Sequence, residues 1–174
     1  MSPTMWYFAR SAGLVAYLLL SASVVAGTLM SGRATLTWPR FAVEELHRFV
    51  AILTGIFIVL HGASLLLDRV VPISFGQMLV PFTSHYRPPA VGLGVTTAEV
   101  LAAVGLTNLF RCELPRQFWR RVHYLTIPAW VLASLHGVLA GSDALDPWFA
   151  GIAAAVMTAV GLAFAFRARR VLAA

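Results

Sequence analysis

Lysine is absent from this 174-residue chain, although the chain carries 13 basic residues. All 13 are arginines, set against seven acidic residues, and the formal net charge is +6. Only 11% of the residues are charged and 59% are hydrophobic, which excludes an ordinary soluble domain. The arginines lie at the ends of apolar stretches, where they anchor membrane proteins, so the charge is not a nucleic-acid signature. We expect an integral membrane protein that contacts lipid and binds no nucleic acid.

Cysteine is almost absent as well, since Cys112 is the only one. A single thiol excludes an internal disulfide, an iron–sulfur cluster held by cysteines alone, and covalent haem attachment through a Cys-x-x-Cys-His motif. A Gly-rich dinucleotide-binding fingerprint is also missing. Any haem must therefore be held non-covalently, and a nicotinamide cofactor has no recognisable site.

Long apolar runs dominate the sequence instead. A membrane-spanning helix takes about 20 residues, and five stretches are long enough. The sequence predicts an all-α, five-helix transmembrane bundle in a single domain over residues 1–174, with Pro39, Pro115 and the Asp146-Pro147 step near helix starts. The first stretch is similar to a secretory signal but lacks a basic start, so we expect it to remain as a span. The expected helices are 8–30, 44–67, 91–110, 119–140 and 147–166.

The arginine distribution predicts the orientation of this bundle. Positively charged residues favour the cytoplasmic side, which places the C-terminus in the cytoplasm and the N-terminus outside a prokaryotic plasma membrane. The second and fourth spans then run in parallel, from inside to outside. Ten arginines belong to the inner side (Arg33, Arg40, Arg48, Arg111, Arg116, Arg120, Arg121, Arg167, Arg169 and Arg170), and three to the outer side (Arg10, Arg69 and Arg87).

Four histidines form two matched pairs on the second and fourth spans. His47 and His61 lie 14 residues apart, and His123 and His136 lie 13 apart. Ligating side chains are expensive inside a bilayer, so this pattern indicates a function. Fourteen helical residues rotate by about 1,400°, close to whole turns, and rise by about 21 Å. The spacing predicts two stacked bis-histidine haems, an inner one between His47 and His123 and an outer one between His61 and His136.

The 13-residue spacing needs a correction, because an ideal helix would place His123 and His136 on different faces. Pro128 lies between them, and a proline kinks a helix and changes its phase. We expect Pro128 to supply that correction. Two strong axial ligands leave no open position on iron, which favours electron transfer over oxygen binding.

Glycines accompany the histidines. Gly62 and Gly137 directly follow the outer pair, where a missing side chain lets a flat ligand approach, so both are candidate cofactor-binding residues. Gly13 and Gly27 in the first span are also 14 residues apart. They either seat the same two haem rings or serve the small-residue packing that membrane helices commonly use.

Charged residues near the histidines have two interpretations each. Arg48, Arg120 and Arg121 are candidate partners of haem propionates, because guanidinium pairs well with carboxylate. The alternative is that they only anchor the topology, and the two roles can coexist. Glu99 in the third span could relay protons, contact a quinone or face a polar partner or a haem edge.

The loop at 68–90 is expected to lie on the outer membrane surface as a cap over the outer pair. It contains His85, which is outside the pattern of pairs. We interpret His85 as a solvated loop residue, with a quinone or partner contact as the second choice.

Over about residues 40–140 the sequence resembles the ferric reductase-like transmembrane domain family. That family includes the membrane parts of ferric reductases and NADPH oxidases, and the haem-binding membrane subunit of the bacterial periplasmic methionine sulfoxide reductase system. The resemblance implies bis-histidine b-type haems and transmembrane electron transfer. It rests on the two histidine pairs, the two His-Gly steps and the approach Trp119-Arg120-Arg121-Val122-His123-Tyr124.

Two departures from that family shape the functional prediction. Its usual bundle has six helices and this chain shows five, while the oxidases continue into a flavin and nicotinamide domain where this sequence stops at Ala174. We therefore expect the electron-transfer subunit of an oxidoreductase, without catalytic residues of its own. Electrons would come from a separate flavoprotein or a membrane quinol. They would pass to an outer-face acceptor, either ferric iron or a partner reductase.

Two other functions stay open at this point. One is a metal or proton transport subunit that uses the histidines without haem, although histidines four turns apart on one helix do not converge as zinc ligands must. The other is a structural membrane subunit with a degenerate haem fold. The presence of all four histidines argues against the structural role.

Overall fold

The computed structural model describes residues 4–31, 38–69, 71–144 and 146–172, and every regular element in these residues is a helix. Five spans are long and apolar enough to cross a membrane, the fourth of them made of two helices. The predicted all-α bundle with five spans is therefore confirmed. The helices are α1 (Thr4–Ser31), α2 (Arg40–Leu67), α3 (Phe75–Leu79), α4 (Pro88–Leu109), α5 (Arg116–Tyr124), α6 (Thr126–Ala140) and α7 (Pro147–Leu172).

Prolines mark the starts of these helices. Pro39 and Pro115 are the N-cap residues of α2 and α5, and Pro147 is the first residue of α7, as the sequence predicts. Pro88 adds a fourth case at the start of α4, after Arg87 in the left-handed conformation with φ of 38°. Proline suits these positions because the first N–H groups of a helix have no partner within it.

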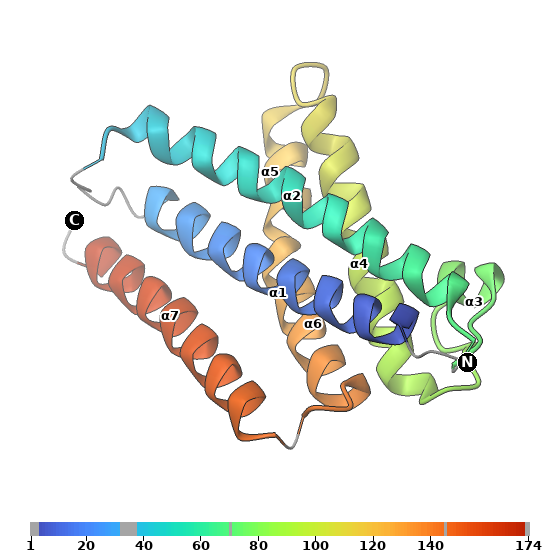
Figure 1. Ribbon diagram of the computed structural model, residues 1–174. Helices are drawn as coiled ribbons and strands as arrows, with labels where there is room; N and C mark the ends of the chain where they lie inside the picture. The colour runs from blue at the N-terminus through green and yellow to red at the C-terminus, as the bar shows by residue number, and fades with distance from the viewer. Residues whose placement is uncertain (1–3, 32–37, 70, 145, 173–174) are drawn as a thin grey trace.

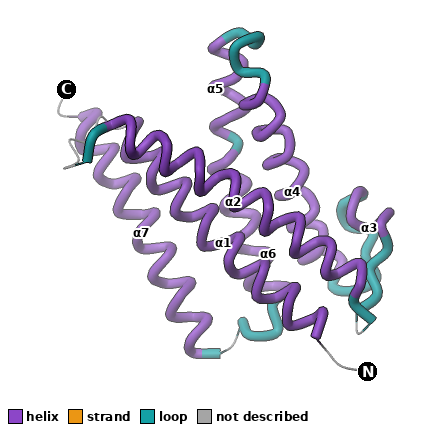
Figure 2. The backbone as a smooth tube through the Cα atoms, turned by 45° about the horizontal axis from the view of Figure 1, so that its top comes forward, coloured by secondary structure: helices purple, strands orange, loops and turns teal. Residues whose placement is uncertain are grey.

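The helix α1 runs through the middle of the bundle. It packs against α2 on one side and against α7 on the other, and it also contacts α6 (Figure 1). The helices α4, α5 and α6 form a second group that crosses behind α1 and α2 (Figure 2). The main neighbour of α2 is α1, and α2 touches α4 only lightly. Side chains of α2 therefore reach the second group without close backbone packing.

A small core ties α1 to α6 and α7. Its buried members are Leu20 and Val24 of α1, Trp130 of α6 and Val160 of α7. The Trp130 Nε1–H donates a hydrogen bond to the Ser21 hydroxyl at 2.9 Å, inside the buried region. A buried polar group needs such a partner, so this bond stabilises the contact between α1 and α6.

The fourth span is broken at Leu125. The helix α5 ends at Tyr124, α6 begins at Thr126, and the Leu125 N–H reaches back three residues to the Val122 carbonyl at 3.0 Å. Pro128 explains the break, because it has no N–H for the Tyr124 carbonyl four residues earlier and its ring crowds that carbonyl. The sequence predicts one helix over 119–140 that is kinked by Pro128, and the structure has two helices that meet at Leu125, three residues before that proline.

The loop between α2 and α4 is pinned to other elements. Phe82 has a φ of 67° and directs its ring against Gly92 of α4, where a Cβ would not fit beside that ring. The Arg87 guanidinium donates a hydrogen bond to the Leu139 carbonyl of α6 at 2.8 Å. These contacts hold the loop against the ends of α4 and α6.

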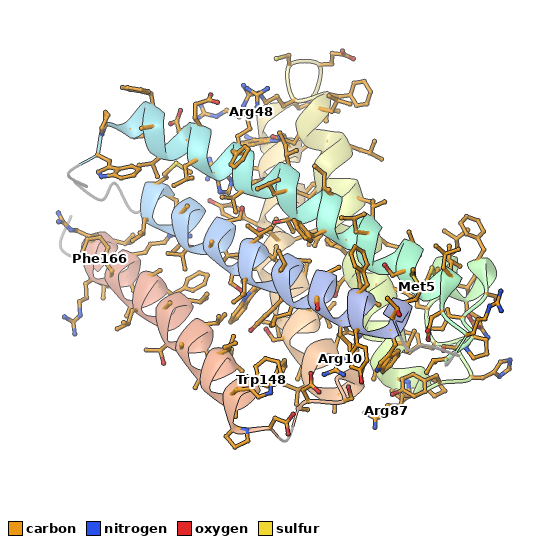
Figure 3. All side chains as sticks on the ribbon, viewed as in Figure 1. Met5, Arg10, Arg48, Arg87, Trp148 and Phe166 are labelled. Atoms are coloured by element: carbon orange, nitrogen blue, oxygen red, sulfur yellow. The ribbon has the colours of Figure 1, made fainter. Side chains whose placement is uncertain are left out.

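The arginines separate to two ends of the bundle, as predicted. We call the end that holds the start of α2, the α4–α5 loop and the end of α7 the arginine-rich end (Figure 1). At the opposite end Arg10 forms an ion pair with Asp143, and Figure 3 shows Arg10 and Arg87 there, away from Arg48. Arg33 lies outside the described residues. Nine of the predicted inner arginines are described: Arg40, Arg48, Arg111, Arg116, Arg120, Arg121, Arg167, Arg169 and Arg170.

Candidate cofactor site

The four histidines meet in the two predicted pairs. The ring centres of His47 on α2 and His123 on α5 are 6.1 Å apart, with 70° between the ring planes. Those of His61 on α2 and His136 on α6 are 6.2 Å apart, with 78° between the planes. We call His47 and His123 the inner pair, which is nearer the arginine-rich end, and His61 and His136 the outer pair. The two pairs have nearly the same geometry, although the spacing along the chain differs between the helices.

Three of these imidazoles are held by backbone carbonyls. The Nδ1 atom lies 3.0 Å from the Ser23 carbonyl oxygen in His47, 2.7 Å from that of Ala9 in His61, and 2.8 Å from that of Ala90 in His136. A carbonyl only accepts, so Nδ1 must carry the proton in each case. The Nε2 atom is then the unprotonated nitrogen with a lone pair available to a metal ion. This arrangement is the usual support of a metal-binding histidine, because it sets both the tautomer and the ring orientation.

A glycine lies beside each of these three rings. A Cβ added at Gly94 would come within 2.7 Å of His136, and one at Gly13 within 2.9 Å of His61. The same Cβ at Gly27 would lie 3.3 Å from His47. Each glycine comes four residues after the carbonyl that accepts from the histidine, so one turn of helix provides both the space and the acceptor. We call this combination of a glycine and the preceding carbonyl a glycine seat.

His123 has no glycine seat. It stacks on Trp119, one turn earlier in α5, with ring centres 5.2 Å apart and 22° between the planes. Within the part of the chain that the structure describes, His123 Nδ1 and Trp119 Nε1 are both buried without a hydrogen-bond partner. The inner pair therefore has one ligand supported by a carbonyl, whereas the outer pair has two.

The predicted roles of the glycines have different outcomes. Gly13 and Gly27 do form two seats, but the rings that face them are the imidazoles of α2, which pack closely on α1. Gly62 and Gly137 face no histidine ring, since the nearest atoms to a Cβ there are Met78 Sδ at 4.0 Å and Phe149 Cζ at 3.9 Å, respectively. The approach of a flat ligand at Gly62 and Gly137 stays a prediction.

The sequence alone does not single out Gly94 as a neighbour of a histidine. Its seat repeats a pattern in which a small residue precedes a glycine by four positions, as Ala90 precedes Gly94 and Ser23 precedes Gly27. Such small-residue pairs are common in membrane helices for packing alone. The pattern becomes informative only when a histidine of another helix is known to face it.

The charged candidates and His85 all lie at exposed positions. Arg48 in the first half of α2 and Arg120 and Arg121 in α5 are all exposed, on the side of the inner pair. The Arg120 guanidinium lies 6.0 Å from the Tyr124 ring centre. Glu99 is exposed in the middle of α4, and His85 is exposed in the loop before α4. Neither Glu99 nor His85 is in a described contact with the histidine pairs.

The geometry of each pair suits an octahedral metal with two imidazole ligands. Two metal–nitrogen bonds of about 2.0 Å, plus roughly 1.2 Å from each nitrogen to its ring centre, separate the centres by about 6.4 Å, close to the observed 6.1 and 6.2 Å. Among the described residues no cluster of three or more His, Cys, Asp or Glu side chains could hold a metal ion. A haem would supply the missing four nitrogens in its own plane, so these residues fit a bis-histidine haem better than a bare metal.

Comparison with known proteins bears on the same region. The family described as "Ferric reductase like transmembrane component" matches residues 12–134, which include the inner pair and His61. No curated protein and no solved structure gave a significant match. Domains of this family are membrane electron carriers that commonly bind haem. The match covers well over half of the chain, and this multi-pass membrane protein therefore belongs to the ferric reductase-like transmembrane family.

Proposed function

We propose that this protein carries electrons across a prokaryotic plasma membrane through two b-type haems, each held between the histidines of one pair. The observation that carries the proposal is the matched separation of the ring centres, 6.1 Å in the inner pair and 6.2 Å in the outer pair. At these separations the two imidazoles of a pair would hold one haem iron between them. The glycine seats support the proposal further, because they leave Nε2 as the ligating atom in three of the four histidines.

Other residues would complete each site. Arg48, Arg120 and Arg121 would pair with the propionates of the inner haem, because guanidinium matches carboxylate geometry. Gly62 and Gly137 would leave room for a flat ring beside the outer pair. A haem bound there would supply a one-electron ferric–ferrous couple, and the helices around each histidine pair would shield it from water. The chain's own residues then bind, orient and insulate the redox centre.

The direction of transfer follows from the proposed orientation. With the arginine-rich end in the cytoplasm, the inner pair would receive electrons from a separate flavoprotein or a membrane quinol. The outer pair would deliver them to ferric iron or to a partner reductase on the outer face.

Haem content and single-histidine variants test this proposal. The protein, expressed with ample haem and purified in detergent, should show b-type absorbance after dithionite reduction and about two haems per chain. His61→Ala or His136→Ala should remove one haem, and His47→Ala or His123→Ala the other. The two groups of variants should keep different residual spectra.

The control is His85→Ala, because His85 is exposed outside both pairs and its loss should leave both haems. A colourless wild-type protein would overturn the proposal. Metal-dependent flux in liposomes by that haem-free protein would favour the transport alternative instead. Equal haem loss from all five histidine variants would contradict the pairing.

A further inference from the structure

The two histidine pairs differ in the hydrogen bonds behind their ligands. Both outer ligands donate Nδ1–H to a carbonyl, at 2.7 Å for His61 and 2.8 Å for His136. In the inner pair only His47 does so, at 3.0 Å, while the buried Nδ1 of His123 has no partner among the described residues. The two pairs therefore have the same ring separation but a different number of hydrogen bonds from Nδ1–H to backbone carbonyls.

This difference has a known electronic effect. A carbonyl that accepts from Nδ1–H makes the imidazole more basic, and a more basic axial ligand favours ferric over ferrous iron. A site with two such bonds therefore holds the reduced state less well than a site with one. Nearby positive charge acts the opposite way, because it stabilises the added electron. Arg48, Arg120 and Arg121 all lie on the side of the inner pair.

We propose that the glycine seats of Gly13 and Gly94 make the outer site the one of lower midpoint potential. This inference rests on the proposed function. It concerns the order of the two sites, whereas the proposed function requires only that both hold haem. Gly13 and Gly94 are positioning residues that act through His61 and His136. At equilibrium a single electron then resides at the inner pair and leaves it when an outer acceptor draws it away.

The seats can be disturbed by one methyl group. Gly94→Ala puts a Cβ within 2.7 Å of the His136 ring, so the ring must shift away from the Ala90 carbonyl. Gly13→Ala does the same to His61 at 2.9 Å, and Gly27→Ala is milder at 3.3 Å. Gly105 of α4 is the matched control, because no atom lies within 4 Å of a Cβ placed there.

A potentiometric titration of the intact protein, followed by haem absorbance, tests the order. We expect two one-electron waves in the wild type. His123→Ala, which keeps the outer site, should retain the lower wave, and His136→Ala should retain the upper one. Gly94→Ala and Gly13→Ala should move the lower wave towards the upper one, while Gly105→Ala leaves both in place.

Several results would overturn the inference. One is a lower wave that persists in His136→Ala, and another is a pair of seat variants that keep two haems and both wild-type waves. If Gly94→Ala fails to hold its haem, the wild-type titration with the two histidine variants still decides the order. A wild-type protein without haem shows no waves at all, so failure of the proposed function is recognised separately.

Discussion

The helix α2 and the fourth span each present two histidines to the other, but they use different backbones. In α2 the helix is uninterrupted from Arg40 to Leu67, and a 14-residue spacing returns His47 and His61 to one face. The fourth span has a 13-residue spacing and a break at Leu125. If those 13 residues make four turns, they average about 3.25 residues per turn, between the 3₁₀ and α values. A break in a helix can therefore compensate for a histidine spacing that is one residue shorter.

The largest expected effect comes from giving α2 the spacing of the fourth span without its break. Deletion of Gly55, which is exposed and contacts nothing at its Cβ position, places His47 and His61 13 residues apart in a continuous helix. They would then differ in direction by about 140°. We expect the purified protein to lose one of its two haems, measured per chain by reduced absorbance.

Gly55→Ala is the control for this deletion, since it changes the same position without changing the phase. It should keep both haems. A deletion variant that also keeps both would show that helix phase does not determine the pairing.

A smaller loss of haem is expected when the helix break at Leu125 is repaired. Pro128→Ala restores an N–H for the Tyr124 carbonyl and should straighten α5 onto α6. Proline costs up to about 3 kcal/mol in a helix interior, so the haem-free protein should become more stable to heat. The haem content should fall at the same time, because His123 turns away from His47. Thermal unfolding of the haem-free protein and haem per chain should therefore change in opposite directions.

Pro147→Ala provides a matched proline control. Pro147 is the first residue of α7, where the missing N–H has no helical partner in any case. This variant should therefore change neither the thermal stability of the haem-free protein nor the haem content. Unchanged haem content in Pro128→Ala would show that the pairing of the histidines does not depend on the break.

The smallest expected effect is on the free energy of unfolding, and it compares the buried tryptophans in the two halves of the fourth span. Trp130 of α6 donates to Ser21 of α1, whereas the Trp119 N–H of α5 is buried without a described partner. Trp130→Phe should lower the free energy of unfolding by about 1 kcal/mol, the value of one buried hydrogen bond. Trp119→Phe should lower it less or not at all. Chemical denaturation of both variants, with haem retained, measures the difference.

Most of the architecture could be predicted from the sequence, because a bilayer imposes strong rules on composition. Five apolar runs, prolines at helix starts and the separation of the arginines to two ends all follow from those rules. The two histidine pairs could also be predicted, since α2 alone sets a repeat of four turns. Pro128 predicts a kink in the fourth span, but the sequence does not determine that the helix breaks at Leu125.

The support of the histidines could not be predicted in the same way. Gly62 and Gly137 follow histidines directly in sequence, yet the glycines that touch imidazoles are Gly13, Gly27 and Gly94, on other helices. Likewise, the lack of a carbonyl behind His123 has no signal in the neighbouring residues. A close contact between helices depends on their crossing and rotation, which local sequence does not encode.

The order of residues along the chain thus determines that helices form, where they break and which residues repeat on one face. These properties depend on local geometry and on transfer from water to lipid, and both act on each segment separately. Packing determines which carbonyl accepts from which histidine, because those bonds join residues 24 to 52 positions apart. The inner and outer pairs differ in the number of carbonyls that accept from their histidines. Only tertiary packing decides this difference, since it arises where α1 and α4 pass close to the imidazoles.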